Sequence, residues 1–190
     1  MKDERAAEPC RPDMSDEDLL AEAQAGDDAA FHELTDRHAQ RLFRLAFSLV
    51  GGTVDAEDVV QETLLGAFEH IRKFEGRSSV KTWLTSILMR QAARHHRRRS
   101  RSRETWLANG DHAAPGRGGG VREASDRRLD VRRALGRLSA DHRQVVVLRE
   151  YDGMSYAEMA EVLGVPQGTV ESRLHRARQE LKDLLRDYLP

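Results

Sequence analysis

The chain has 190 residues, the size of one ordinary domain or two small ones, and a formal net charge of only −1 although 33% of its residues are charged. No apolar run approaches the ~18 residues of a membrane-spanning helix, no signal peptide is visible, and a single cysteine, Cys10, excludes an internal disulfide. These properties predict a cytoplasmic, helix-rich protein that does not insert into a membrane.

Glycine, proline and serine divide the first half of the chain into helical segments, and no strand is predicted. A short capped helix begins after Ser15 and ends at Gly26. A longer amphipathic helix carries apolar residues from Phe31 to Leu49 and stops at Gly51.

Two further helices are predicted before residue 100. The first is capped by Thr53 or Asp55 and buries a stripe that includes Phe68. The second opens at Ser78 and Ser79 and ends in a run of arginines. The inward stripe expected for the first of them consists of Val59, Val60, Leu64, Phe68 and Ile71.

Residues 100–126 lack a helical pattern and are rich in glycine, which predicts a flexible linker. Beyond it, Ser139 caps a helix, Ser155 and Glu158 form a capping box, and the last helix covers Gln167–Tyr188. The first helix after the linker places Leu129, Val131, Ala134, Leu135 and Leu138 inward. The chain is therefore predicted to be all-α, with two small helical domains on a flexible tether.

The segment from Tyr156 to Arg176 has the layout of a helix-turn-helix. Ala160 is a small residue where two helices approach closely, and Gly164 permits the left-handed turn between them. An ordinary helical hairpin with a solvated charged face is the alternative. The outward face of the second helix presents Gln167, Glu171, Ser172, His175, Arg176 and Gln179.

Charge is distributed unevenly along the chain. Residues 1–36 hold 12 acidic and 3 basic side chains, whereas residues 72–103 hold 11 basic and one acidic. In the basic segment Phe74 and Trp83 lie among the cations, a pattern typical of single-stranded DNA binding, although both aromatics also fit a helix core. We hypothesise that the acidic head covers the basic segment in the free protein, so that deleting residues 1–26 raises affinity for DNA at low salt.

Four segments, at 31–34, 55–63, 77–84 and 164–178, resemble in this order those of bacterial RNA polymerase sigma factors, and more narrowly the extracytoplasmic-function group. The resemblance implies that the second domain carries a helix-turn-helix. It divides the chain into a disordered N-terminal extension (1–14), sigma region 2 (15–99), a flexible linker (100–126) and sigma region 4 (127–190).

The resemblance also implies roles for single residues. In the family, a helix with the pattern Asp-x-x-Gln-Glu docks on the largest polymerase subunit, and here those positions are Asp58, Gln61 and Glu62. They are spaced at i, i+3 and i+4, so they share one helix face.

The implied contacts to the −10 element lie in the basic segment. A flipped base would enter a pocket formed by the loop around Glu75–Ser79, and Trp83 would wedge at the melted edge. Primary members of the family carry two adjacent aromatics here, but this chain has Trp83 and Leu84. The full −10 set is Lys73, Arg77, Ser78, Ser79, Lys81, Trp83, Arg90 and Arg94.

The implied contacts to the −35 element lie on the last helix. Glu171 departs from the basic residue that many relatives carry, and it can either accept from a cytosine amino group or repel a phosphate. The full −35 set is Gln167, Thr169, Glu171, Ser172, Arg173, His175, Arg176 and Arg178.

The implied function is promoter-specific transcription initiation in stress-response regulation, by a subunit that is not itself an enzyme and needs no cofactor or metal. The implied partners are core RNA polymerase, promoter DNA and a cognate anti-sigma factor, with the chain monomeric when free. A stand-alone helix-turn-helix regulator is the alternative. A metal-dependent hydrolase using His95 and His96 is disfavoured because adjacent side chains on a helix point about 100° apart.

Overall fold

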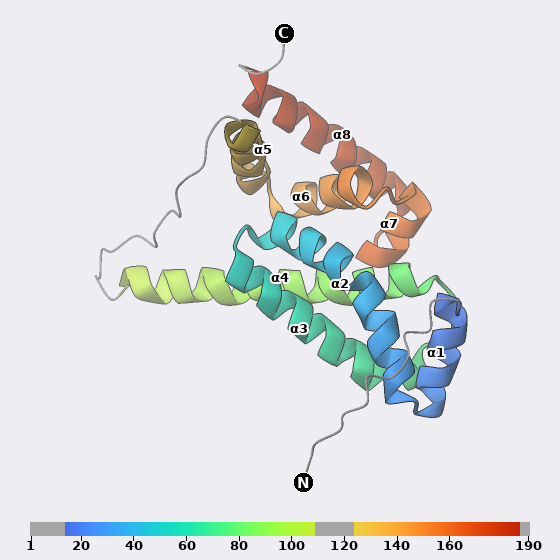
Figure 1. The fold of residues 1–190 in the computed structure, drawn as a ribbon. Coiled ribbons are helices and arrows are strands. Elements are labelled where there is room, and N and C mark those ends of the chain that lie inside the picture. The colour runs from blue at the N-terminus through green and yellow to red at the C-terminus, as the bar shows by residue number, and fades with distance from the viewer. Residues whose placement is uncertain (1–13, 109–123, 187–190) are drawn as a thin grey trace.

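The computed structural model describes the backbone of residues 14–108 and 124–186 and the side chains of residues 14–99 and 131–186. Within these ranges the chain is helical and contains no strand, in agreement with the predicted all-α class (Figure 1). None of the described helices is both long and apolar enough to cross a membrane. The elements are α1 (Asp16–Ala25), α2 (Asp28–Val50), α3 (Thr53–His70), η1 (Ile71–Lys73), α4 (Val80–Ala108), α5 (Ala124–Arg137), α6 (Ala140–Val146), η2 (Val147–Tyr151), α7 (Tyr156–Leu163) and α8 (Gln167–Leu184).

The helix ends of the N-terminal half, α1 to α4, follow the predicted signals with one exception. Ser15 and Asp18 form a capping box at α1, and Gly26 and Gly51 end α1 and α2 in the left-handed conformation. The predicted side-chain cap of α3 is wrong, because its N-cap is Gly52, which has no side chain. Asp55 instead pairs with Arg99 of α4 at 2.5 Å.

Helix α4 is longer than the sequence indicates. Its first turn is closed by Ser79, whose Oγ accepts from the amide of Thr82 at 3.1 Å. The helix then continues to Ala108, past the point at residue 100 where the linker was predicted to begin, and α5 already begins at Ala124. Residues 109–123 of the predicted linker, and residues 1–13 of the predicted extension, lie outside the described ranges.

The C-terminal half, α5 to α8, contains the two predicted caps. Ser139 accepts from the amide of His142, and Ser155 forms the capping box with Glu158. Val131 of α5, predicted to point inward, is 39% exposed, and the side chain of Leu129 lies outside the described ranges. A π-helical turn, η2, follows α6 and carries the buried Val147 and Leu148.

The Ser155–Glu158 capping box makes the stability of α7 depend on pH. Hydrogen bonds from the backbone and hydroxyl of Ser155 lower the pKa of Glu158 below its ordinary value of 4.5. We expect Glu158→Gln to lower the free energy of unfolding by about 0.5 kcal/mol at pH 7, because the amide keeps an acceptor for Ser155 but loses the charge that favours the helix N-terminus. A folded pKa below the unfolded one stabilises above pH 4.5, so the difference should vanish as pH falls through the folded pKa. Urea unfolding across pH measures this, and Glu161→Gln, an exposed glutamate outside the cap, should have no such effect.

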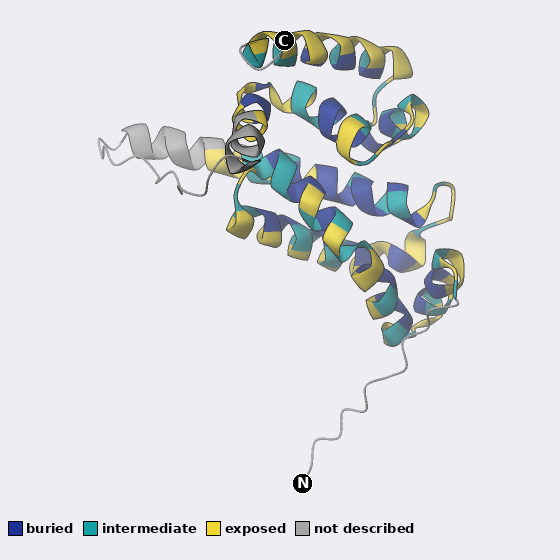
Figure 2. Cartoon of the chain, turned by 45° about the horizontal axis from the view of Figure 1, so that its top comes forward, coloured by how far each residue is buried: buried dark blue, intermediate teal, exposed yellow. Residues whose placement is uncertain are grey.

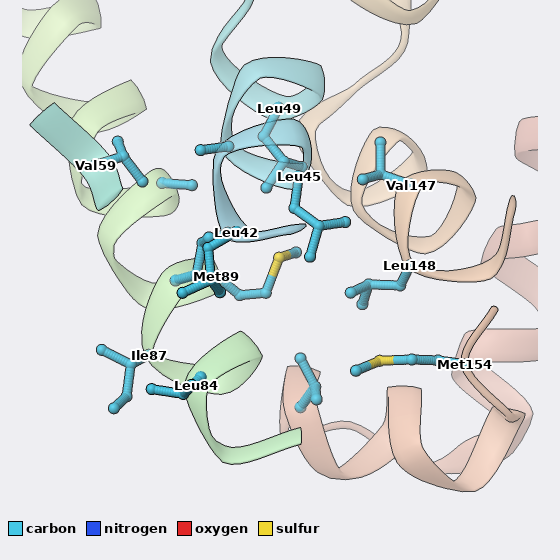
Figure 3. Packing of buried hydrophobic residues seen from close by; sticks show 14 of the residues in the cluster. Leu42, Leu45, Leu49, Val59, Leu84, Ile87, Met89, Val147, Leu148 and Met154 are labelled. Carbon is cyan, nitrogen blue, oxygen red and sulfur yellow. The ribbon is translucent and has the colours of Figure 1, made fainter. Parts of the chain in front are cut away.

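The two halves pack against each other through one continuous apolar core, which the sequence did not indicate. Leu45 and Leu49 of α2 face Val147, Leu148 and Met154 of the C-terminal half (Figure 3). Figure 1 shows α6 and α7 along one side of α2 and α4, with α8 outside them. The predicted tether therefore joins two domains that contact each other directly.

A polar junction closes one end of this core at the last turn of α2. The carbonyl of Leu49 accepts from His96 Nε2 at 3.1 Å and from Arg143 Nη1 at 2.7 Å. Arg143 also donates to the carbonyls of Leu135, Gly136 and Leu138, and burial lowers the pKa of its guanidinium. Burial likewise lowers the pKa of His96, which favours the neutral ring at the junction. One end of α2 is thus tied to both α4 and α6.

Candidate nucleic-acid interface

A pocket of about 540 Å³ lies between the loop after η1 and the first half of α4. Its wall contains two half-buried aromatics, Phe74 and Trp83, which stack with their ring centroids 4.7 Å apart and their planes at 24°. The sequence left open whether Trp83 belongs to the core or to a DNA-binding surface. Its indole packs on the core and also lines the pocket, so it has features of both. Exposed aromatic surface beside cations is the combination that binds unstacked bases.

The loop that shapes this pocket is held from α1. Gln24 Nε2 donates to the carbonyls of Ile71 and Phe74 at 2.9 and 2.7 Å, which anchors both sides of the turn after η1. Gly76 adopts a positive φ of 68°, and Arg77 donates to the carboxylate of Glu75. These contacts therefore hold the loop in a defined conformation in the free chain.

Six of the eight residues predicted to contact the −10 element line the pocket. The other two, Ser79 and Lys81, do not: Ser79 caps α4, and the ammonium of Lys81 lies 3.5 Å from a carboxylate oxygen of Asp152 in the C-terminal half. The six lining residues are Lys73, Arg77, Ser78, Trp83, Arg90 and Arg94.

The acidic head does not reach this pocket with its described residues. Asp16 accepts instead from His38 at 2.7 Å and from Arg37 at 3.5 Å, both on α2. The hypothesis that the acidic head covers the basic segment also involves residues 1–13, which lie outside the described ranges.

The three residues predicted to bind polymerase lie on one accessible face of α3. Asp58 and Gln61 are exposed, and Glu62 pairs with Arg98 of α4 at 3.3 Å. They border a groove of about 560 Å³ between α3 and α4, hereafter the α3 groove. Exposed carboxylate and amide groups such as those of Asp58 and Gln61 are suited to pairing with a basic partner surface.

The same face carries exposed apolar residues that the sequence analysis missed or misplaced. Leu65, which lines the α3 groove, is 64% exposed, and Val54 is 69% exposed. Phe68 was predicted to point inward, but it is 53% exposed and makes an edge contact with Phe31 at 5.2 Å. Helical spacing left the orientation of Phe68 open, because this position lies at the boundary between the apolar stripe of α3 and the face that carries Asp58, Gln61 and Glu62. Exposed apolar residues beside charged ones are typical of a protein-binding surface.

The C-terminal half contains the predicted helix-turn-helix. Helices α7 and α8 are joined by a turn in which Gly164 has a φ of 64°, and Met159 and Val170 are buried at the corner. The outer side of α8 is exposed to solvent along its length (Figure 2). The exposed members of the predicted −35 set are Gln167, Glu171, Ser172, His175, Arg176 and Arg178, whereas Thr169 and Arg173 are partly buried.

Acidic residues of the same half engage several of these side chains. Arg173 pairs with Asp141 at 2.6 Å, Arg178 with Glu150 at 2.7 Å, and Glu171 accepts from Gln167 at 2.9 Å. Arg176 and His175 thus stand out as the exposed basic and aromatic groups at the middle of the outer face.

The histidines considered as metal ligands have other contacts. His95 lies 3.3 Å from Asp55, and His96 binds the Leu49 carbonyl. Among the side chains of residues 14–99 and 131–186, no group of three or more potential ligands could hold a metal ion.

Comparisons with known proteins match both halves to one family. The family described as sigma-70 region 2 matches residues 34–102, and the family described as sigma-70, region 4 matches residues 128–181. The first match contains the α3 face and every residue that lines the pocket except Glu161, and the second contains the helix-turn-helix.

Individual relatives agree with these matches. The chain is 36% identical over 175 residues to the ECF RNA polymerase sigma factor SigM of Mycobacterium tuberculosis, covering 92% of this chain and 87% of SigM. It is 37% identical to the ECF RNA polymerase sigma factor SigE of Mycolicibacterium smegmatis over 84% of this chain, but it spans only 64% of SigE. Among solved structures, the sigma factor RpoE of Bartonella quintana, in complex with the anti-sigma factor NepR, matches with a TM-score of 0.64 and 32% identity over 82% of this chain and 96% of that one.

Proposed function

Since the chain belongs to the extracytoplasmic-function (ECF) group of sigma-70 factors, we propose that it binds core RNA polymerase and directs initiation at promoters by recognising their −10 and −35 elements. In this proposal residues 15–99 act as region 2, residues 127–190 as region 4, and residues 100–126 connect them. The polymerase forms the RNA, and the chain supplies specificity without catalysis of its own. It works in the cytoplasm, where polymerase and promoter meet.

The pocket beside α4 that is lined by Phe74 and Trp83, hereafter the aromatic pocket, is the observation that carries this proposal. Melting a promoter requires a surface that binds unpaired bases better than paired ones, and stacked aromatics ringed by cations have that preference. Phe74 and Trp83 supply the stacking surface, while Arg90 and Arg94 are exposed along α4 for the phosphates of the displaced strand. Ser78 supplies a hydroxyl at the pocket wall for the base edge.

The helix-turn-helix supports the second half of the proposal. Its exposed outer face, centred on His175 and Arg176, fits a major groove, where arginine reads guanine and phosphates fix the register. Two weak contacts joined by one tether bind one promoter more strongly than either contact alone. The near-neutral net charge of the chain explains why the polymerase is needed, because free affinity for DNA depends mainly on phosphate neutralisation.

Two protein partners complete the proposal. Core polymerase docks on the α3 face through Asp58, Gln61 and Glu62, together with the exposed Leu65. The likeness to RpoE held by NepR supports an anti-sigma factor as the second partner, with the chain otherwise monomeric.

The function is tested by co-elution and transcription. Purified chain mixed with core polymerase should co-elute on a sizing column, and the mixture should initiate RNA at defined sites on genomic fragments that core polymerase alone does not use. A stand-alone regulator would instead protect palindromic sites as a dimer without polymerase. That second pattern would replace the proposal with the alternative function.

Arg176 should contribute to −35 reading more than its neighbour Arg178. We expect Arg176→Ala to lower transcription from a matched promoter about tenfold, because one base-reading arginine contributes ~1–3 kcal/mol of discrimination. Arg178→Ala is the matched control, since Glu150 already holds that guanidinium at 2.7 Å. Transcription from promoters with single −35 substitutions measures both. Equal losses in the two variants would contradict the assignment.

A further inference from the structure

One glutamine of α1 is hydrogen-bonded to both sides of the turn that precedes the aromatic pocket. Gln24 Nε2 donates to the carbonyl of Ile71 at 2.9 Å and to the carbonyl of Phe74 at 2.7 Å, which lie 47 and 50 positions further along the chain. A carbonyl oxygen can only accept, so the amide nitrogen, which carries two hydrogens, must be the atom that faces them. Both donors of this amide are thus used on the backbone of a distant segment.

Helix α1, which carries Gln24, is itself fixed in the N-terminal half. Leu19 is fully buried, and Ala23, next to Gln24, is 6% exposed. The carboxylate of Asp16 pairs with His38 of α2 at 2.7 Å. The helix lies beside η1 and the start of α4 (Figure 1). Gln24 therefore links the turn after η1 to a helix whose position is set by its own packing.

The turn that Gln24 holds carries one of the two stacked aromatics. Phe74 follows η1 directly, and its amide donates to the carbonyl of Ile71 at 3.1 Å. Its ring stacks on Trp83 with the centroids 4.7 Å apart. Fixing the carbonyls on both sides of the turn also fixes the direction in which the Phe74 side chain leaves the backbone. The stacked pair at the pocket wall therefore depends on a contact made from α1.

The pocket loop, defined as residues 74–79, is otherwise open to solvent along most of its length. Glu75, Gly76 and Arg77 are exposed, and Arg77 donates to Glu75 of the same loop, a contact that does not tie the loop to a helix. A loop that is ordered only when its ligand arrives lowers affinity by the conformational entropy it then loses. The hydrogen bonds of Gln24 order one end of this loop before DNA binds.

We propose that Gln24 is a positioning residue for capture of the unpaired −10 strand: it holds Phe74 and the pocket loop in the conformation that accepts a base. Gln24 is not among the residues that line the pocket, so it acts through the loop and not by touching DNA. The inference rests on the proposed use of the aromatic pocket for the −10 strand. It adds that promoter melting depends on α1, a helix outside the pocket.

Two substitutions test the hydrogen bonds of Gln24. Gln24→Glu keeps the shape of the side chain but replaces both donors with acceptors, because a carboxylate cannot donate. Gln24→Leu removes the donors without adding charge, and it keeps the test valid if Gln24→Glu does not fold. Gln40→Glu is the matched control, since it makes the same change at an exposed glutamine of α2. Thermal melting of each full-length chain confirms folding.

Two readouts distinguish positioning from a general loss of structure. With core polymerase and a promoter found by mapping RNA 5′ ends, permanganate reactivity followed at several polymerase concentrations separates initial promoter binding from the rate of strand opening. In a Trp106→Phe background, acrylamide quenching of the one remaining tryptophan reports how firmly Phe74 covers the indole of Trp83. For the kinetic readout, each Gln24 variant is also combined with Trp83→Ala.

We expect both Gln24 variants to slow strand opening about fivefold to tenfold, the effect of one or two lost hydrogen bonds, and to leave initial promoter binding within about twofold. Quenching of Trp83 should rise in both, and Gln40→Glu should match the wild type. In the Trp83→Ala background the Gln24 variants should slow opening little further, because both residues act through the same pocket.

Three results would overturn the role of Gln24 and leave the proposed function intact, provided that Trp83→Ala still slows opening. These are an unchanged opening rate in both Gln24 variants, losses that add fully to that of Trp83→Ala, and an equal loss in Gln40→Glu. Strand opening that neither the Gln24 variants nor Trp83→Ala affect would overturn both the inference and the proposed use of the pocket.

Discussion

Trp83→Ala should lower the rate of open-complex formation by about 10- to 100-fold while leaving polymerase binding unchanged. The expected size follows from stacking, because the contact of one base with an aromatic side chain contributes ~1–3 kcal/mol. The indole is half-buried and stacks on Phe74 at 4.7 Å, so it presents a preformed surface to an unpaired base. The next residue is a buried leucine, Leu84, so it offers no second aromatic surface that could replace the indole. Permanganate reactivity of thymines in the start region measures the rate.

Trp83→Phe is the matched control for this prediction. It keeps an aromatic face at the pocket wall, so it should retain most of the melting activity. A loss of equal size in the two variants would mean that the indole matters for packing and not for stacking on DNA. Melting unaffected by Trp83→Ala would remove the pocket from the mechanism.

Asp58→Arg should lower the affinity for core polymerase about 30-fold or more. Reversing a charge that is paired across an interface costs ~2 kcal/mol or more, because the partner's cation then meets a like charge. Asp58 is exposed and borders the α3 groove, so the free chain should keep its stability. Titration of labelled chain with core polymerase measures the affinity, and thermal melting confirms the fold.

Asp36→Arg on α2 is the matched control, since it makes the same charge change at another exposed aspartate. It should leave affinity within about twofold, as expected for a charge outside the interface. Leu65→Ala tests the apolar part of the same face, where a 64% exposed side chain can be shortened without cost to the core. A similar loss for Asp36→Arg would indicate a general charge effect and contradict docking on α3.

Most of the secondary structure could be predicted because its signals are local. The capping boxes at Ser15 and Ser155 and the glycine stops at Gly26 and Gly164 depend on residues within one helical turn, and the structure contains each of them. The end of α4 at Ala108 was not predictable in this way, because a run of arginine and serine has neither an apolar stripe nor a stop signal.

Contacts between distant segments could not be read from the same patterns. Asp152 pairs with Arg41 and Lys81, and these three residues are separated by 40 to 111 positions. Nothing in their local sequence distinguishes them from solvated charges. The packing of the two halves escaped prediction for the same reason, since Leu148 and Met154 fit the core of a separate small domain equally well.

The candidate site was predictable in its composition but not in its arrangement. The resemblance assigned Trp83, Arg90 and Arg94 to one function, and the structure brings them to one pocket. It also assigned Lys81, which the structure pairs with Asp152. The exposed Leu65 had no sequence signal, because an apolar residue on a helix is ordinarily assigned to the core.

The central claim is that this chain selects promoters for the polymerase, and the most direct measurement is the mapping of RNA 5′ ends. Genomic DNA would be transcribed in vitro by core polymerase with and without the purified chain. The account predicts a set of new start sites that share one upstream −10 motif and one −35 motif at a constant spacing, and that weaken together with Trp83→Ala. Start sites identical to those of core polymerase alone would contradict it.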